Sequence, residues 1–304
     1  MKGMTMKETI EEQAVVDDAA CAECLTRPRV LERLGPYLEN AVHNTHGKSI
    51  RHFLELDTEA LVAAVGDRHA NEILEEAQAE GGSKVLSECE AAGVWAVCRH
   101  NKDYPNALKV LKDPPAVLFG RGDYSRFFWL TVDECVSIVG SRRATSYGLE
   151  VSRSLGHEFA AEGRAVVSGL ALGIDGSAHR GALEAGLTVA VLATGPDRAY
   201  PVSHTRLYRK IVEEGIVLSE MPPGARAWKW CFPARNRIIA ALSATTIVVE
   251  AAARSGSMTA ARYAEDLGRQ VAAVPGLITS GNAAGTNELI AKGATLVRDA
   301  SDVQ

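Results

Sequence analysis

The sequence predicts an α/β protein with a doubly wound, mostly parallel sheet, preceded by a helical region. From about residue 134, short β-branched runs alternate with helical stretches. These runs are apolar throughout, as expected for strands that helices cover on both faces. Regular alternation of strand and helix is the pattern of a parallel sheet built from β–α–β units.

The first part of the chain carries helical patterns. Apolar residues recur at helical spacing in "PRVLERLGPYLENAV" and "TEALVAAVG", and "HANEILEEAQAE" predicts a further helix that ends at Gly81 and Gly82. A mixed segment follows, in which Pro114 and Pro115 mark a turn before the strand-like "AVLFG". We therefore predict a helical domain over residues 1–90 and an α/β domain over residues 91–304.

The expected strands of the second domain are "VSIVG", "RAVVSG", "TVAVLATG", "IVLSE", "TTIVVE", "QVAAVPG" and "ATLV". The helices between them are expected to start near Tyr147, Asp175, His204, Ala234, Ser257 and Thr286. In such a sheet, ligands bind beyond the carboxyl ends of the strands. The residues that follow each strand are therefore the candidates for function.

Composition places the chain among globular proteins. Of 304 residues, 46% are hydrophobic and 23% are charged, and no apolar run reaches the ~18 residues of a membrane span. The N-terminus is acidic and lacks the apolar core of a secretory signal. We therefore expect a cytoplasmic protein with no membrane partner.

Charge is distributed unevenly along the chain. Residues 1–100 hold 18 acids and 10 bases, whereas residues 101–304 hold 20 acids and 23 bases. A polyanionic partner should therefore prefer the second part of the chain.

Two of the six cysteines, Cys21 and Cys24, form a Cys-x-x-Cys pair. A zinc site would need a second pair of ligands at close spacing, and the sequence offers none in suitable form. No strand–helix context supports a thioredoxin-like redox site either. We expect two ordinary thiols, no metal and no cofactor.

The loop after "VSIVG" has the residues of a phosphate-binding site. Gly140 allows close approach of the backbone, Ser141 offers a hydroxyl, and Arg142 and Arg143 offer forked donors. The next helix should turn its N-terminal amides toward the same place. On these residues alone, phosphate binding and simple packing are equally compatible with the loop.

The next loop, "LALGIDGSAHRGAL", is interpreted as structural. Gly169 and Gly173 provide the bend, and Asp175 is a candidate N-cap for the helix that carries His179. Because no nucleophile or partner carboxylate accompanies His179, we expect it to pack rather than to act as a base.

The stretch "MPPGARAWKWCFPARNR" combines cations with large aromatics. Its cations are Arg226, Lys229, Arg235 and Arg237, and its aromatics are Trp228, Trp230 and Phe232. Exposed nucleic-acid bases stack on aromatic rings with a gain of about 1–3 kcal/mol per base, while cations hold the backbone. The alternative is that the aromatics pack in the core, and we expect at least one tryptophan to do so. Pro233 is expected to begin a helix with Asn236 and Arg237 in its first turn.

Ser255, Gly256 and Ser257, after "TTIVVE", precede another helix N-terminus and form a second candidate anion site. Glu250 is expected either to bind a ribose or to hold a loop, and Asn287 to fix one. The sequence has no Walker A motif, no H-E-x-x-H motif and no cluster of carboxylates. This pattern favours binding over catalysis.

These loops, in this order, resemble the DNA-processing protein A family (DprA, also called Smf). The matching stretches are "VSIVGSRRATSYG", "VVSGLALGIDGSAHRGAL", "VLATGPDRAYPVSH", "LSEMPPG", "FPARNRIIAALS", "VVEAAARSGSMTAARYAEDLGRQVAAVPG" and "GTNELIAKGA". The resemblance covers about residues 94–297. It implies an extended Rossmann-type fold that binds single-stranded DNA without sequence preference, with a small helical (SAM-like) domain before it. It also implies a homodimer, not an enzyme, that loads a RecA-type recombinase onto incoming DNA in natural transformation and recombination.

The resemblance also assigns roles to residues. Arg142 matches a phosphate-binding arginine, Lys229 a DNA-contacting lysine, and Phe232 a base-stacking aromatic. The remaining matches are the pocket floor, from Gly140, Ser141, Ser168 and Gly169, and a basic rim from Arg235 and Arg237.

The chain departs from the family pattern at several places. His204 stands where asparagine is common, and Leu172 stands where some relatives have a lysine, which would weaken DNA binding. The chain stops soon after "ATLV", so no C-terminal winged-helix domain is expected.

Two other functions stay open. One is a nucleotide-hydrolysing enzyme related to the phosphoribohydrolases, although their P-G-G-x-G-T motif is absent here. The other is a module that binds a small nucleotide without turnover.

Overall fold

The computed structural model describes residues 20–44, 49–128 and 130–303. The N-terminal stretch that argues against a secretory signal lies outside these residues. Among the described residues, no helix has the length and apolar character that crossing a bilayer requires.

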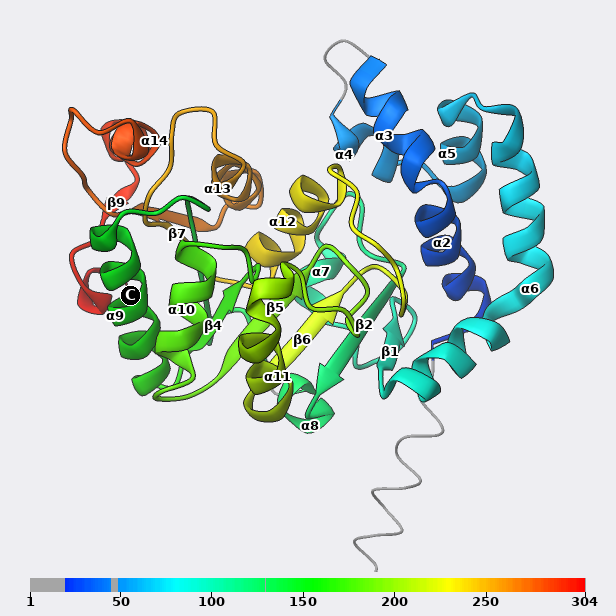
Figure 1. The fold of residues 1–304 in the computed structure, drawn as a ribbon, viewed down its shortest axis with the longest axis horizontal. Helices are drawn as coiled ribbons and strands as arrows, with labels where there is room; N and C mark the ends of the chain where they lie inside the picture. Colours follow the sequence, from blue (N-terminus) through cyan, green and yellow to red (C-terminus); the bar gives the residue numbers. More distant parts are fainter. Residues whose placement is uncertain (1–19, 45–48, 129, 304) are drawn as a thin grey trace, which may run out of the picture.

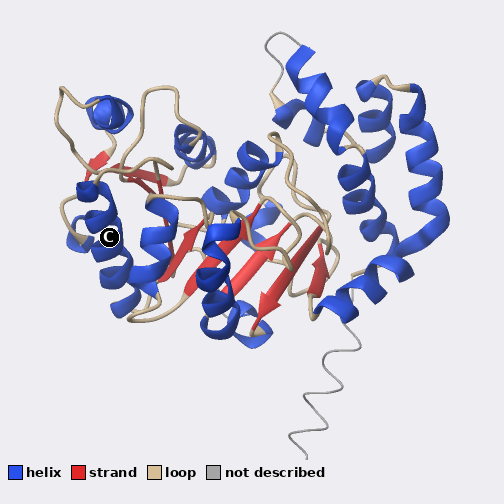
Figure 2. Ribbon diagram, in the orientation of Figure 1, coloured by secondary structure: helices blue, strands red, loops and turns tan. Residues whose placement is uncertain are grey.

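One nine-stranded sheet forms the centre of the described structure, with strand order β1-β2-β6-β5-β4-β3-β7-β8-β9 (Figure 2). The strands are β1 (Trp95–Cys98), β2 (Val117–Gly122), β3 (Cys135–Val139), β4 (Ala165–Ser168), β5 (Thr188–Leu192), β6 (Ile216–Ser219), β7 (Thr245–Val248), β8 (Gln270–Ala273) and β9 (Thr295–Leu296). The β1–β2 and β2–β6 pairs are antiparallel, and every other pair is parallel. The predicted doubly wound, mostly parallel sheet is confirmed.

Helices precede β1 and then connect the strands (Figure 1). The helices before β1 are α2 (Ala22–Arg33), α3 (Gly35–Asn44), α4 (Ile50–Leu54), α5 (Thr58–Val65) and α6 (Arg68–Ala92). The later ones are α7 (Asn106–Lys109), α8 (Tyr124–Phe128), α9 (Ser146–Ala161), α10 (Ile174–Ala182), α11 (Thr205–Glu214), α12 (Cys231–Ala241), α13 (Ser257–Asp266) and α14 (Ala284–Ala291). Short 3₁₀ turns are η1 (Val202–His204), η2 (Gly281–Ala283) and η3 (Ala300–Asp302).

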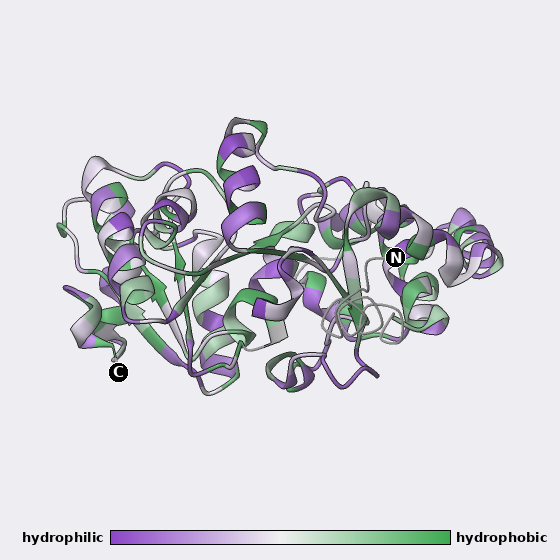
Figure 3. Ribbon diagram, turned by 90° about the horizontal axis from the view of Figure 1, so that it is seen from below, coloured by the Kyte–Doolittle hydropathy of each residue, from purple (hydrophilic) through white to green (hydrophobic). Residues whose placement is uncertain are grey.

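The two faces of the sheet are covered by different helices. Phe159 of α9 packs with Ile138 of β3 in one buried cluster, whereas Ile238 of α12 packs with Val139 of β3 in another. Successive side chains of a strand point to opposite faces, so adjacent residues of β3 serve opposite layers. Colouring by hydropathy shows hydrophobic strands between helices whose outer faces are hydrophilic (Figure 3).

The helices α2–α6 lie beside the β1–β2 edge (Figure 1). Leu25 of α2 and Val85 of α6 pack with Phe119 of β2 in a buried cluster. The first helical segment of α6 ends at Gly81, as predicted, because the backbone there is non-helical, with a φ of 65° and a ψ of 176°. A second helical segment, which the sequence did not indicate, then continues to Ala92 and packs on α2.

Two predicted details of the helix starts are wrong. Helix α10 starts near Asp175 as predicted, but its N-cap is Gly173, and Asp175 lies inside the first turn. Helix α12 begins at Cys231 rather than at Pro233. A proline at the third position of a helix is tolerated, because the first four N–H groups have no intrahelical acceptor.

The strand order reverses between β3 and β7. The chain runs from β3 through β4 and β5 to β6 in one direction, and then returns to β7 on the other side of β3. The loops after β3 and β7 therefore leave the sheet in opposite directions. Such a switch point opens a crevice at the carboxyl ends of the strands, where α/β proteins bind their ligands.

Candidate functional site

A cavity of about 570 Å³ lies at this switch point. Ten of the residues predicted to contact nucleic acid line it, namely Gly140, Ser141, Arg142, Arg143, Phe232, Arg235, Asn236, Ser255, Gly256 and Ser257. They come from the loops after β3 and β7 and from the start of α12. The topology thus brings together residues more than a hundred positions apart in sequence.

The loop after β3 is held by its backbone. The Ser141 amide donates to the Glu250 carbonyl at 2.7 Å, and the Arg143 amide donates to the Ser141 hydroxyl at 3.1 Å. A side chain at Gly140 would place its Cβ 2.6 Å from Ile174 Cγ1, so the close packing requires glycine. The loop therefore has one defined shape, with the Arg142 and Arg143 side chains exposed.

Glu250 holds this loop. Its carboxylate accepts hydrogen bonds from the Thr145 amide at 2.9 Å and the Thr145 hydroxyl at 2.6 Å. Thr145 in turn caps α9 by accepting from the Gly148 amide at 3.2 Å. Of the two expected roles for Glu250, the structure supports loop anchoring.

A cation and an aromatic ring meet at the mouth of the cavity. The guanidinium carbon of Arg142 lies 4.6 Å from the centre of the Phe232 ring, within the range of a cation–π contact. Tyr200, which is 45% exposed, is a second neighbour of the Phe232 ring, with 5.4 Å between the two ring centroids. The Phe232 and Tyr200 rings are tilted by 48° to each other and form a partly exposed aromatic surface beside the positive charge of Arg142.

Free cations surround this surface. Among the described residues, no carboxylate lies within ion-pair distance of Arg142, Arg143 or Arg254. Two further residues that were not predicted from the sequence line the cavity. Arg254 directly precedes the predicted Ser255–Gly256–Ser257 motif, and Asn282 donates to the Arg143 carbonyl at 3.1 Å. Asn282 lies nine residues after Ala273, the last residue of β8, so it is too far from the strand end for the pattern to select it.

The N-terminus of α13 faces the same cavity. Gly256 and Ser257 stand at its start, and the Ser255 and Ser257 hydroxyls are 2.8 Å apart. The Asn236 side chain donates to the Gly256 carbonyl at 3.1 Å and fixes this turn. A helix N-terminus attracts anions through its free amides and its dipole.

Arg235 lies in the wall of the cavity rather than on an exposed rim. Only 7% of the residue is exposed, and its guanidinium donates to the Gly169 and Val191 carbonyls at 2.5 and 2.6 Å. Burial lowers the pKa of Arg235 to about 10, and Asp175 at 3.6 Å opposes this effect. Arg235 therefore stays charged at neutral pH and contributes positive charge to the cavity from within.

Two predicted contact residues are buried away from the cavity. Ser168 is fully buried, and its hydroxyl donates to the Ile138 carbonyl at 2.6 Å. Arg237 is 1% exposed and donates to both Glu220 oxygens, at 2.9 and 2.6 Å. Burial alone would lower the pKa of Arg237, but the carboxylates of Glu220 and Asp113 raise it. The prediction that Arg237 forms part of a basic rim is wrong, because the helix turns it into the core.

Both tryptophans pack against the N-terminal helices. Trp230 is 4% exposed and donates from Nε1 to the Gly35 carbonyl at 3.0 Å, and a Cβ at Gly35 would lie 2.0 Å from Trp228 Nε1. Between them, Lys229 points outward with 95% of its side chain exposed, and Glu39 is 3.8 Å away. The expectation that at least one tryptophan is a core residue is confirmed, and Lys229 lies outside the cavity lining.

Gly169, His179 and Asn287 serve the framework around the site. Gly169 lines a small adjoining hollow of about 80 Å³ with Leu172 and Phe232.

His179 is held in place by two hydrogen bonds. Its Nε2 accepts from the Leu170 amide at 3.2 Å, and its Nδ1 bonds to the Thr188 hydroxyl at 2.7 Å. Burial lowers the pKa of His179 to about 3, so it is a neutral packing residue, as predicted. Asn287 bonds to both backbone polar groups of Gly276 and fixes that loop.

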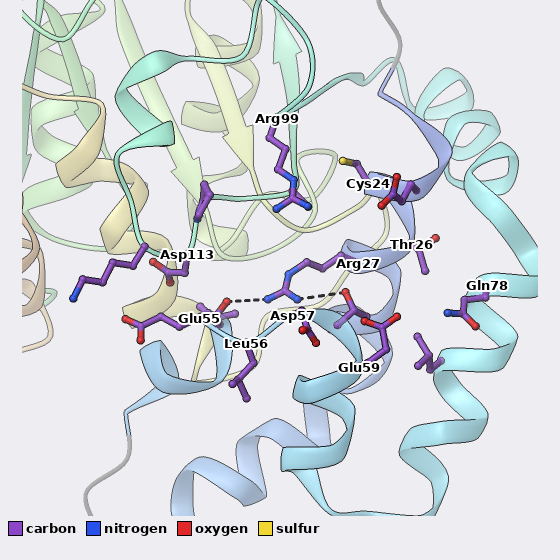
Figure 4. Close-up of a pocket in the computed structure, with 17 residues that line it drawn as sticks. Cys24, Thr26, Arg27, Glu55, Leu56, Asp57, Glu59, Gln78, Arg99 and Asp113 are labelled. Atoms are coloured by element: carbon purple, nitrogen blue, oxygen red, sulfur yellow. Dashed lines mark hydrogen bonds between the residues drawn. The ribbon is translucent and has the colours of Figure 1, made fainter.

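A second cavity, of about 530 Å³, lies between the N-terminal helices and the sheet (Figure 4). Its lining includes the acids Glu23, Glu55, Asp57, Glu59 and Asp113 and the bases Arg27, Arg99 and Lys112. Arg27 is held inside by the Leu54 carbonyl at 2.8 Å (Figure 4). An excess of acids repels a polyanion, whereas the switch-point cavity has four arginines and one aspartate. The switch-point cavity is therefore the better candidate for an anionic ligand.

The prediction that Cys21 and Cys24 lack a second pair of metal ligands is wrong. Cys98 and His100 lie beside them, with the four ligand atoms all within 4.8 Å of one another. A Cys-x-His pair separated by more than seventy residues is not a recognisable spacing, so only the fold reveals it.

Comparison with known proteins identifies the family of this chain. A family model described as DNA recombination-mediator protein A matches residues 95–304. The DNA processing protein DprA of Bacillus subtilis is 40% identical over 221 residues, which are 72% of this chain and 73% of that protein. A putative DNA processing protein DprA of Mycobacterium tuberculosis is 48% identical over 168 residues, which are 55% of this chain and 43% of that protein.

Two solved structures of DNA processing protein A match the fold of this chain. The DNA processing protein A of Streptococcus pneumoniae matches with a TM-score of 0.71 and 32% identity, over 92% of this chain and 95% of that chain. A structure of the Helicobacter pylori protein, described for its single-stranded DNA binding mode, matches with a TM-score of 0.62 and 32% identity, over 69% and 93% of the two chains.

Proposed function

Since the chain belongs to the DNA recombination-mediator protein A family, we propose that it binds single-stranded DNA at the switch-point cavity. The observation that carries this proposal is the contact between Arg142 and Phe232, at 4.6 Å, beside cations that have no carboxylate partner among the described residues. A single strand exposes both phosphates and unpaired base faces. A cavity that offers guanidinium groups next to a ring matches both features.

Each part of the proposed site has a chemical role. Arg142, Arg143 and Arg254 bind phosphate oxygens, and the start of α13 adds backbone amides to the same anions. Phe232 and Tyr200 provide faces on which bases stack. Because these groups read phosphate charge and ring surface rather than base edges, binding is independent of sequence.

Lys229 adds a cation outside the cavity. Its amide donates to Glu39 of α3 at 2.8 Å, so the N-terminal helices set the position of the loop. Its side chain is almost fully exposed, and a strand that leaves the cavity along α12 can reach it. The N-terminal helices thereby contribute to DNA binding by positioning Lys229, without contacting a phosphate themselves.

The proposal extends to recombination. The protein loads a RecA-type recombinase onto single-stranded DNA during transformation, and it works as a homodimer. The family description, DNA recombination-mediator protein A, supports a role in recombination. The check is whether the protein shortens the lag of recombinase assembly on strands coated by a single-strand-binding protein, with the dimer measured by light scattering.

The proposed role is binding rather than catalysis. Glu250 is occupied by Thr145, and His179 is buried and neutral, so neither supplies an available base in the cavity. Release of free base from nucleoside monophosphates would contradict this part and favour a phosphoribohydrolase-like activity. Stabilisation against heat by a mononucleotide, without binding of oligonucleotides, would instead favour a nucleotide-binding module.

The test of the proposed function is a titration of a fluorescent single-stranded oligonucleotide at low and physiological salt, with unlabelled duplex as competitor. We expect tight binding that weakens with salt and that duplex displaces poorly, because its bases are not free to stack. Equal competition by duplex and single strand would contradict the stacking role.

A further inference from the structure

We propose that Cys21, Cys24, Cys98 and His100 form a structural zinc site that fastens the N-terminal helices to the sheet. The site does not depend on the proposed DNA binding. Cys21 and Cys24 lie before the family-matched residues 95–304, whereas Cys98 and His100 lie within them. The argument therefore rests on this chain's own geometry.

The elements of the fold place the four ligands. Cys21 is the residue before α2, and Cys24 lies in its first turn. Cys98 is the last residue of β1, and His100 follows in the turn after it. Figure 4 shows Cys24 on α2 facing the segment that carries Arg99, the residue between the other two ligands. Two ligands thus come from the helical part and two from the sheet.

The distances between the candidate ligand atoms are compatible with a tetrahedral ion. With zinc–sulfur and zinc–nitrogen bonds of about 2.3 and 2.05 Å, tetrahedral geometry places two sulfurs about 3.8 Å apart and a sulfur and a nitrogen about 3.6 Å apart. His100 Nδ1 is 3.4 Å from both Cys21 Sγ and Cys24 Sγ, and the sulfurs of Cys98 and Cys21 are 3.9 Å apart. All four ligand atoms lie within 4.8 Å of one another, so one zinc ion can reach them after small side-chain adjustments.

The four candidate ligands lie at the boundary between the interior and the surface. Cys24 and Cys98 are buried, Cys21 is half-buried and His100 is exposed. The imidazole therefore lies on the solvent side of the three sulfurs.

The ligand set indicates a structural role. Three sulfurs and one imidazole fill all four positions, whereas catalytic zinc keeps one position open for water. The ion would close the 77-residue separation between Cys21 and Cys98, and cross-links that close long loops remove the most entropy from the unfolded chain. Zinc therefore holds α2, and with it the second cavity of Figure 4, against β1.

The test is the metal content of the full chain, purified without chelator and then reconstituted with zinc alone. We expect about one zinc per chain by mass spectrometry of the metal, and a lower melting temperature after chelation. With cobalt in place of zinc, the intense visible bands of four-coordinate thiolate ligation should appear. Zinc well below one per chain after reconstitution, or a disulfide between Cys21 and Cys98 in the protein as purified, would overturn the proposal.

Variants separate ligation from folding. His100 is exposed, so His100→Ala should fold and bind zinc at least tenfold more weakly in competition with a chelator, whereas His100→Cys should retain the ion. Cys24→Ser should lose zinc, and Cys89→Ser is its matched control, because Cys89 is a buried cysteine in the same apolar cluster that is not a ligand. Equal zinc in Cys24→Ser, His100→Ala and the wild type would contradict the assignment.

Discussion

The guanidinium carbon of Arg142 lies 4.6 Å above the ring of Phe232, although the two residues belong to different loops. Arg142 follows β3, and Phe232 lies in the first turn of α12. The contact keeps a free cation and an aromatic face in a fixed relation at the mouth of the cavity. Its two members should contribute to DNA binding in different ways, and this difference can be measured.

Arg142→Ala should weaken binding of single-stranded DNA and make it less sensitive to salt. A hydrogen bond to a charged group contributes about 1.5–3 kcal/mol, which corresponds to a loss of roughly tenfold to a hundredfold in affinity. The slope of log affinity against log salt should fall by about 0.7 for the lost phosphate contact. Fluorescence anisotropy over a salt series measures both quantities.

Arg180→Ala is the matched control for Arg142→Ala. Arg180 is exposed on α10, near the end of that helix and away from the cavity lining. The Arg180→Ala variant loses the same charge as Arg142→Ala, but its affinity for single-stranded DNA and its salt slope should stay close to those of the wild type. An equal loss in both variants would mean that net charge, not the site, drives binding.

Phe232→Ala should weaken binding by about 1–3 kcal/mol, the contribution of one stacked base, with little change in the salt slope. Phe232→Tyr keeps the ring and should bind like the wild type. A large change in the salt slope of Phe232→Ala would indicate that the ring acts only by positioning Arg142.

Leu172→Lys should strengthen DNA binding. Leu172 is 44% exposed and lines the small hollow together with Arg142 and Phe232, so a lysine there gains a phosphate contact. The salt slope should become steeper by about 0.7. Leu172→Met, which changes shape without charge, is the control, and an affinity for Leu172→Lys at or below that of Leu172→Met would contradict the placement of DNA over this hollow.

Arg237→Ala should destabilise the fold and leave the DNA contacts in place. The variant leaves Glu220 and Asp113 buried without their cation, and breaking a buried ion pair in this way costs about 3–5 kcal/mol. Urea unfolding measures this loss. An Arg237→Ala protein with wild-type stability and reduced DNA affinity would show instead that Arg237 touches DNA.

His179 should make stability depend on pH. Burial lowers its pKa from 6.5 to about 3 in the folded state. Above pH 6.5 the imidazole is neutral in both states and has no effect. As the pH falls below this value, His179 becomes protonated in the unfolded chain but stays neutral in the folded chain. The free energy of unfolding therefore decreases by up to about 1.4 kcal/mol per pH unit.

His179→Gln is the variant that isolates this contribution, because glutamine is uncharged and can still accept from the Leu170 amide. Unfolding free energies of the wild type and the variant, measured between neutral and mildly acidic pH, should show a shallower slope for the variant. Identical slopes would mean that His179 titrates normally in the folded state.

The positions of the strands could be predicted from the sequence, whereas the directions in which the side chains of α12 point could not. Apolar runs such as "VSIVG" and "TTIVVE" correspond to β3 and β7, because strands buried on both faces need such composition. The strand-end rule also selected Arg142 and Ser255, which line the cavity. Residues that directly follow a strand of a parallel sheet can therefore be assigned to the binding edge from the sequence.

Other features depend on three-dimensional packing that no local pattern encodes. Arg235 and Arg237 are two residues apart on α12, yet one reaches the cavity wall and the other an internal pair of carboxylates. The Cys98–His100 pair joins Cys21 and Cys24 only because β1 ends beside the start of α2. Such assignments need the fold.

The most direct test of the proposed DNA site is photo-crosslinking of a single-stranded oligonucleotide that contains iodouracil, followed by mass spectrometry of the peptides. Iodouracil crosslinks to aromatic side chains that lie against the base. We predict crosslinks to Phe232 or Tyr200, which disappear in the corresponding alanine variants. Crosslinks that map only to the second cavity, or to surfaces away from the β3–β7 switch point, would contradict the account.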